Sequence, residues 1–135
     1  MNIGEKFYCS RCLAELHDEI ICPKCGHDPR STDDEYALEE GTTLKAMRFH
    51  VGAIRKKLKC GYFYGAFDYF REKPVYIFEY FPALGLKREE DSGSRVIIPE
   101  RCQAEFEEGM RKLMAGLKCH HNIFCENNTL YAFRS

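Results

Sequence analysis

Four cysteines near the N-terminus are the residues in this sequence best suited to chemistry. They form two Cys-x-x-Cys pairs, Cys9 with Cys12 and Cys22 with Cys25, and nine residues separate the pairs. Each pair can turn tightly and direct two thiolates at one point, so two pairs supply the tetrahedral set of sulfurs that zinc prefers. Gly26, directly after the last cysteine, permits the positive φ that such a turn often needs. We therefore predict a zinc ribbon in which these four cysteines hold Zn²⁺.

The predicted zinc ion has a structural role. Four cysteines fill every position of a tetrahedral site, so none stays open for catalysis, and the metal would fold a module of about 25 residues that lacks a core of its own. A redox Cys-x-x-Cys pair is the alternative, but two pairs in series without a βαβ pattern favour a metal. His17 and His27 could also be ligands; with four cysteines available, we expect both at the surface.

The other four cysteines are scattered along the chain, which favours a reducing compartment over a disulfide framework. We expect Cys60 and Cys102 to be small core residues. The segment KCHHNIFC, residues 118–125, could form a second metal site, although its spacing matches no common pattern. The start of the chain has no apolar signal core, and no apolar run approaches the roughly 18 residues of a membrane span. We therefore expect a cytoplasmic protein without membrane contact.

Charge divides the chain into two parts. Residues 1–45 hold five Lys or Arg and ten Asp or Glu, a net charge of −5, whereas residues 46–135 carry +4. We predict a zinc ribbon at 1–30, an acidic linker at 31–45 and a folded domain at 46–135. The balanced charges of the ribbon favour contact with protein over contact with DNA.

The pattern after residue 46 predicts an α+β fold. Alternating apolar residues indicate strands at 47–54, 60–68 and 74–81, with the basic stretch RKKLK as the first turn and a charged loop after the third strand. The segments NIF and TLYAF near the C-terminus indicate a final hairpin. We expect an antiparallel sheet of about five strands with one packed helix that begins near Pro99. The apolar stripe of this helix consists of Phe106, Met110, Leu113, Met114 and Leu117.

Several motifs follow one another in a specific order. CPKCGHDP at residues 22–29 precedes GTTLKAMRFHVG at 41–52 and VYIFEYFP at 75–82, and FEEGMRKL and HHNIF come later. This order resembles the N-lobe of bacterial serine/threonine protein kinases, in particular those that begin with a zinc ribbon ending in CPxCGxDP and continue with a VAIKEYFP-type strand. The last two motifs are similar to the family's regulatory helix and its HPNIV segment. The resemblance implies a kinase N-lobe-like domain behind a zinc ribbon.

The departures from the kinase pattern predict that this domain is degenerate. The family's glycine-rich phosphate loop falls on Lys56, Leu58 and Gly61, so only its last glycine remains. Backbone amides cannot approach phosphates closely where Cβ atoms stand. The lysine that pairs with the α/β-phosphates falls on Phe78, which carries no charge. No clear equivalent exists for the glutamate of the regulatory helix; the looser alignment there places Ala115 or Gly116 near it.

The resemblance also implies a filled nucleotide site. Tyr76 replaces a small alanine over the adenine, and Phe63 stands two residues after the last glycine, so these rings and Phe78 should fill a pocket rather than line one. The sequence contains no HRD-type loop and no DFG. We therefore expect a truncated, pseudokinase-like lobe that is not an enzyme and does not bind ATP.

Protein binding is the function that these features favour. The rings of Phe63, Tyr76, Phe78 and Tyr80 share one face of the predicted sheet, and exposed apolar patches of this kind usually mark interfaces. We expect a non-catalytic regulator or inhibitor; an anti-defence inhibitor of a phage or mobile element is one form of this hypothesis. The alternatives are that the ribbon or linker covers this face, or that a homodimer joins two such faces.

Two further hypotheses belong to other classes of function. One is nucleic-acid binding by the basic-aromatic turn at 55–64, through the group Arg55, Lys56, Lys57, Lys59 and Tyr62, although a solvated hairpin turn explains the same residues. The other is residual nucleotide binding or a role as the regulatory lobe of a split kinase.

Overall fold

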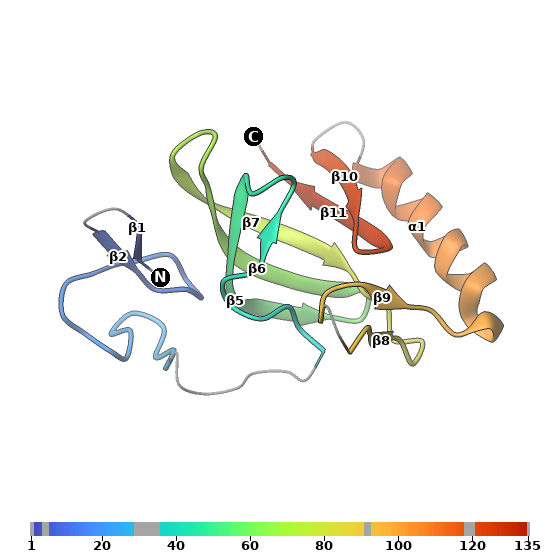
Figure 1. The fold of residues 1–135 in the computed structure, drawn as a ribbon, viewed down its shortest axis with the longest axis horizontal. Coiled ribbons are helices and arrows are strands. Elements are labelled where there is room, and N and C mark those ends of the chain that lie inside the picture. Colours follow the sequence, from blue (N-terminus) through green and yellow to red (C-terminus); the bar gives the residue numbers. More distant parts are fainter. Residues whose placement is uncertain (1, 4–5, 29–35, 91–92, 118–120, 135) are drawn as a thin grey trace.

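The described residues form three antiparallel sheets and one long helix (Figure 1). The computed structural model describes residues 2–3, 6–28, 36–90, 93–117 and 121–134. Within these residues, no helix has the length and apolar character that crossing a membrane would require.

A small sheet at one end of the molecule forms the N-terminal module, which comprises the described residues up to 28. Its strands are β1 (Asn2–Ile3), β2 (Lys6–Tyr8) and β3 (Glu15–Leu16), joined in the order β1-β2-β3. Strands this short bury little apolar surface, so the module depends on other interactions for its stability.

The main sheet has six strands in the order β10-β11-β7-β6-β5-β4, one more than the sequence predicted. The additional strand, β4 (Thr43–Leu44), lies inside the stretch expected to be a loop. It forms because the apolar Leu44 is buried against the core and its backbone pairs with Phe49. The other five strands are β5 (Phe49–Leu58), β6 (Gly61–Asp68), β7 (Lys73–Tyr80), β10 (Asn122–Glu126) and β11 (Thr129–Phe133).

All of the basic stretch RKKLK except its last lysine belongs to a strand and not to the turn. Strand β5 continues through Leu58, which pairs with Gly61, so Lys59 and Cys60 alone form the turn. A two-residue hairpin loop lets the two long strands pair almost to their ends. This turn also explains why Cys60, expected in the core, is exposed, whereas Cys102 is buried as predicted.

The sheet curls into a near-barrel. Its first and last strands approach each other, because the backbone N–H of Lys45 donates to Glu126 Oε1 at 2.9 Å. Inside this closure the ring of Phe49 packs against Phe133, with 4.8 Å between ring centroids, and against Phe124 at 5.9 Å. The expected final hairpin is confirmed: Asn127 and Asn128 form its turn with φ of 52° and 61°, as a two-residue type I′ turn requires.

One helix covers part of the sheet. A 3₁₀ turn (Glu100–Cys102) leads into α1 (Gln103–Leu117), which packs through its buried residue Phe106. Of the predicted stripe, Met114 is exposed instead of packed. The charged loop before the helix contains a short two-stranded sheet, β8 (Lys87–Arg88) with β9 (Val96–Ile97).

Candidate functional site

The four N-terminal cysteines converge on one point. Sγ of Cys9 lies 3.5 Å from Sγ of Cys25, Sγ of Cys12 lies 3.6 Å from Sγ of Cys22, and all four sulfurs lie within 4.8 Å of one another. Four sulfurs at about 2.3 Å from a tetrahedral ion stand roughly 3.8 Å apart. The cluster can therefore hold a metal ion, and the spacing and the sulfur-only donor set both fit zinc.

The two Cys-x-x-Cys turns have the same backbone hydrogen bonds. In the first, the N–H of Leu13 donates to Cys9 O at 2.9 Å; in the second, the N–H of Gly26 donates to Cys22 O at 2.8 Å. Leu13 and Gly26 both have positive φ, 65° and 77°. The second turn uses glycine as predicted, whereas the first accepts a strained leucine, which points to a separate use for the Leu13 side chain.

Burial and backbone hydrogen bonds act in opposite directions on these thiols. Burial raises the pKa of the Cys9 thiol to about 12. Burial also acts to raise the pKa of Cys22, but N–H groups of Cys25 and Lys24 outweigh it and lower this pKa to about 7. A bound cation would stabilise all four thiolates together.

The two neighbouring histidines stand outside this cluster. His17 is exposed, as predicted, but His27 is buried, which corrects the expectation that it lies at the surface. Glu40 returns from far along the chain to contact the His27 ring, with 3.3 Å between Nε2 and Oε1. In the segment KCHHNIFC, residues 118–120 lie outside the described part of the chain, so the second metal site stays a prediction; the cysteine cluster is the single potential metal site among the described residues.

The N-terminal module docks directly on the main sheet. The amide of Ala53 donates to Ser10 O at 2.6 Å, and the hydroxyl of Tyr76 donates to Cys12 O at 3.3 Å. Glycines of the sheet make this approach possible: a Cβ on Gly52 would lie 2.4 Å from Ser10 O, and one on Gly65 would lie 3.0 Å from Leu13 Cδ2. The strained leucine therefore contacts the sheet where the sheet lacks a side chain.

The module and the helix cover opposite ends of the same sheet face (Figure 1). At the module's end, Tyr8 stacks on Phe67 with 6.4 Å between ring centroids. At the helix's end, Tyr80 packs on Phe106 with 4.9 Å between centroids. Between these ends the sheet is open.

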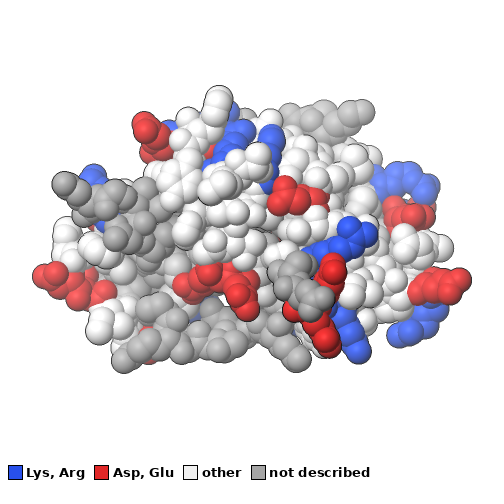
Figure 2. Space-filling view, viewed as in Figure 1, with Lys and Arg blue, Asp and Glu red and all other residues white. Residues whose placement is uncertain are grey.

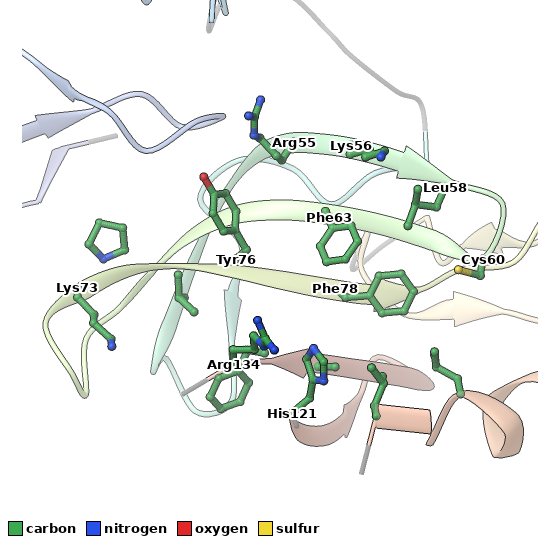
Figure 3. A pocket seen from close by; sticks show the side chains of 16 residues that line it. Arg55, Lys56, Leu58, Cys60, Phe63, Lys73, Tyr76, Phe78, His121 and Arg134 are labelled. Atoms are coloured by element: carbon green, nitrogen blue, oxygen red, sulfur yellow. The ribbon is translucent and has the colours of Figure 1, made fainter. Parts of the chain in front are cut away.

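A pocket of about 710 Å³ occupies this open part (Figure 3). Its floor contains Phe63 and Phe78, which are paired across β6 and β7 with 5.2 Å between ring centroids. Tyr76 stands at the side nearest the module and is 46% exposed, whereas Phe78 is only 7% exposed. Leu113 and Leu117 of α1 contribute to the opposite wall. We name this the basic-rimmed pocket, because cations stand around its apolar interior.

A strand irregularity places two of these cations. Ile54 pairs with Tyr64, but Lys56 pairs with Phe63, so Arg55 is an extra residue in β5. Such a bulge re-aims side chains, and here both Arg55 and Lys56 line the pocket, as Figure 3 shows. The other basic residues that line it are Lys73, His121 and Arg134.

Two predicted site residues are buried elsewhere. Tyr80 is 4% exposed because α1 covers it, and its hydroxyl donates to Phe106 O at 3.1 Å, so it cannot contribute to a free partner surface. Tyr62 is 2% exposed and faces away from the pocket, with its ring centroid 5.4 Å from that of Phe81. It offers no stacking surface for a nucleic acid. Lys57 accompanies it, with Nζ 5.7 Å from the Tyr62 ring centroid, while Lys59 is exposed in the β5–β6 turn.

A buried polar network on the other sheet face was not predicted. Glu79 is fully buried; its carboxylate accepts from Tyr64 at 2.8 Å and from Tyr131 at 2.6 Å, and it pairs with Arg88. Arg88 also donates to the carbonyls of Tyr36 and Ser94. The network thus joins the three strands β6, β7 and β11 to the segments that contain Tyr36, Arg88 and Ser94. The one sequence signal for it was an acidic residue on an otherwise apolar strand face.

The charges in this network determine its pKa values. Burial raises the pKa of Tyr64 and of Tyr131, and the Glu79 carboxylate raises both further. Burial acts to lower the pKa of Arg88, but Glu79 outweighs it and raises that pKa. The two tyrosines therefore stay protonated as donors, and the network holds the fold without offering a group for acid–base catalysis.

Comparison with known proteins finds a similarity in fold. No protein-family model matches the sequence, and no curated protein matches it. Among solved structures, the chain is similar to PpkA-294 in its apo form, with a TM-score of 0.65 and 21% sequence identity over 75% of this chain. PpkA is a bacterial serine/threonine kinase. The matched part covers 39% of the PpkA chain, and identity at this level shows a shared fold alone.

Proposed function

We propose that this protein is a non-catalytic, zinc-binding regulator or inhibitor that acts by binding another protein at the basic-rimmed pocket. The observation that carries the proposal is the pocket itself. It has a volume of about 710 Å³, its lining is largely apolar, and it is open between the N-terminal module and α1. An open apolar pocket with aromatic residues and cations at its edge is typical of interfaces.

Three features support a non-catalytic role. Phe78 lies on the pocket floor at the position where the kinase resemblance calls for the phosphate-binding lysine. Gly61, which remains from the phosphate loop, is required by the sheet, because a Cβ there would lie 1.9 Å from Glu79 O. Ala115 and Gly116, near the position of the regulatory glutamate, carry no charge to pair with a lysine.

The proposed zinc ion stabilises the module that contacts the pocket residue Tyr76. Cys9, Cys12, Cys22 and Cys25 would hold it, and the backbone between the first two cysteines contacts the sheet at Ala53 and Tyr76. The chemistry that zinc would supply is structural cross-linking of the two turns, since four thiolates leave no position for a substrate. Metal analysis of the purified protein by mass spectrometry should give one zinc per chain, and the variant Cys9→Ser should lower it.

Affinity purification followed by mass spectrometry tests the proposal for protein binding. A partner captured by the tagged wild-type protein should be lost with Tyr76→Asp, which changes a half-exposed side chain, and with Phe78→Asp, provided that thermal melting shows each variant folded. Phe70→Asp is the matched control, because Phe70 is 78% exposed and lies outside the pocket. Capture that survives in folded Tyr76→Asp and Phe78→Asp variants would remove the pocket from the proposal.

Nucleic-acid binding is the second candidate, and the cations Arg55 and Lys56 at the pocket are the observation in its favour. Figure 2 shows acidic and basic residues interspersed over one face of the molecule, without a continuous basic surface there among the described residues. Nucleic-acid binding predicts strongly salt-dependent affinity. Fluorescence anisotropy with single- and double-stranded oligonucleotides at about 50 mM salt tests it, and we expect no binding.

A further inference from the structure

We infer that the occupant of the basic-rimmed pocket is an acidic peptide segment of a partner protein that carries a bulky apolar anchor side chain. This inference rests on the proposed function, since it names the chemistry of the partner that the pocket binds.

The apolar interior of the pocket favours an apolar side chain as the anchor. Leu58 and Val75 line it together with the aromatic floor of Phe63 and Phe78, and Leu113 adds a wall from the helix. A cavity of about 710 Å³ lies within the range of specific ligand pockets, roughly 300–1,000 Å³. Burial of a leucine or phenylalanine side chain against this lining is favourable, because it removes apolar surface from water.

The cations at the rim of the pocket favour a negatively charged peptide. Arg55 and Lys56 come from β5, Lys73 from the start of β7, and Arg134 from the chain after β11, so cations approach the opening from several sides (Figure 3). All four are exposed, and none has an ion-pair partner within the part of the chain that the structure describes. No described Asp or Glu lines the pocket. Carboxylates on both flanks of an apolar anchor would match this arrangement.

One polar atom near the opening has no partner. Nδ1 of His121 is buried and has no hydrogen-bond partner among the described residues. Because buried polar atoms are nearly always paired, a peptide in the pocket could supply the missing hydrogen bond. The observation agrees with an occupant that brings polar backbone or side-chain groups as well as an apolar anchor.

The pocket fits a peptide better than a nucleic acid. Nucleic-acid strands bind along a basic groove with exposed aromatic platforms for successive bases. Here Phe78 is nearly buried, Tyr62 faces the opposite side, and Tyr76 is the one half-exposed ring, while leucines of α1 form the opposite wall. Such walls suit an apolar side chain rather than a phosphate backbone.

Selection from a random 12-residue peptide library displayed on phage tests the inference. The bait is the full chain with zinc, and the same library is depleted on the folded variant Tyr76→Asp. We expect pocket-dependent binders that are rich in Asp and Glu around at least one Leu, Ile or Phe. Binders that depend on the pocket but are neutral or basic would overturn the inference and leave the proposed protein binding intact. Absence of pocket-dependent binders would count against both.

Rim variants then test charge directly with a selected peptide. The double variant Lys56→Glu/Lys73→Glu should weaken binding at least about tenfold at low salt, and raising the salt should weaken binding to the wild type. The matched control is Lys87→Glu/Lys112→Glu, because both lysines are exposed and neither lines the pocket. Equal affinities of the two double variants would overturn the inference. So would tighter binding of a single-stranded oligonucleotide to the same rim, or concentration-dependent dimers in sedimentation that Lys56→Glu/Lys73→Glu disrupts.

Discussion

At the scale of single residues, two buried or partly buried ion pairs hold the sheet in shape. Arg88 and Glu79 have side chains that are 6% and 0% exposed, and Arg48 and Asp68 have side chains that are 19% and 1% exposed. A buried pair contributes little net stability, but removing one member leaves an uncompensated charge in the interior. These pairs therefore matter most as constraints on which strands and segments meet.

We predict that Glu79→Gln lowers the free energy of unfolding by about 3–5 kcal/mol, because it leaves the Arg88 guanidinium buried without its counter-charge. Urea unfolding of the zinc-loaded protein measures this change. The double variant Glu79→Gln/Arg88→Met should lose markedly less than the sum of the two single variants. Additive losses, within about 0.5 kcal/mol, would show that the pair is not coupled.

The second pair gives a pH-dependent prediction. Burial acts to raise the pKa of Asp68, but Arg48 and the backbone N–H groups of Arg71 and Phe70 outweigh it and lower this pKa. A carboxyl group whose folded pKa is depressed stabilises the protein fully above its unfolded pKa of about 3.9, and this contribution disappears as pH falls through the folded pKa. The stability difference between wild type and Asp68→Asn should therefore be largest near neutral pH and shrink below about pH 4.

Urea midpoints of both proteins at matched pH values provide the measurement. Comparison with Asp68→Asn at each pH cancels the loss of metal that acid causes in both proteins. A difference that stays constant from neutral to strongly acidic pH would contradict the assigned role of the Arg48–Asp68 pair.

At the scale of elements, the first Cys-x-x-Cys turn connects the metal site to the pocket. Its carbonyls at Ser10 and Cys12 accept hydrogen bonds from the amide of Ala53 and the hydroxyl of Tyr76. Coordination of the proposed zinc ion by Cys9 and Cys12 would fix the shape of this turn. Loss of zinc should therefore loosen the contact with the sheet as well as the module itself.

We predict that chelation of zinc accelerates hydrogen exchange at the Ala53 amide, which donates to Ser10 O at 2.6 Å. The control is the amide of Val51, two residues away on the same strand, which donates to Thr42 O at 2.8 Å and has no contact with the turn. Exchange followed by NMR before and after chelation separates the two. Equal acceleration would mean that the whole sheet opens, and no change at Ala53 would mean that the turn stays docked without metal.

Local sequence patterns predicted most strands, the helix and the cysteine cluster. The features that these patterns did not predict depend on contacts between segments that are distant in sequence. The cysteine cluster and the β10–β11 hairpin depend on neighbouring residues, so spacing and turn chemistry were sufficient. Burial of Tyr80 depends on α1, which is remote in sequence, and the buried His27 contacts Glu40 of a later segment. The bulge at Arg55 is likewise fixed by pairing with β6, which simple alternation along one strand does not reveal.

At the scale of the whole molecule, the N-terminal module and α1 both pack on one face of the main sheet and leave only part of that face free for binding. The N-terminal module covers the end near Gly65, and α1 covers the end near Tyr80, so the pocket between them is bounded by parts that the chain itself supplies. The aromatic face that the sequence indicated is thus partly covered within the chain and partly open. Its open part contains Tyr76, Phe63 and Phe78, with cations at the edge.

This arrangement predicts that ATP does not stabilise the protein. Phe78 supplies no charge for phosphates, and Lys56 and Leu58 carry Cβ atoms that keep backbone amides from approaching phosphates closely, so the positive rim alone would have to hold the nucleotide. A ligand at 100 times its dissociation constant raises the free energy of unfolding by about 2.7 kcal/mol, which shifts the melting temperature of a domain of this size by several degrees. We expect a shift below about 1 °C at millimolar ATP with magnesium, measured against magnesium alone. A larger shift that Phe78→Asp abolishes would favour residual nucleotide binding and contradict the proposed role of the pocket as a site for protein.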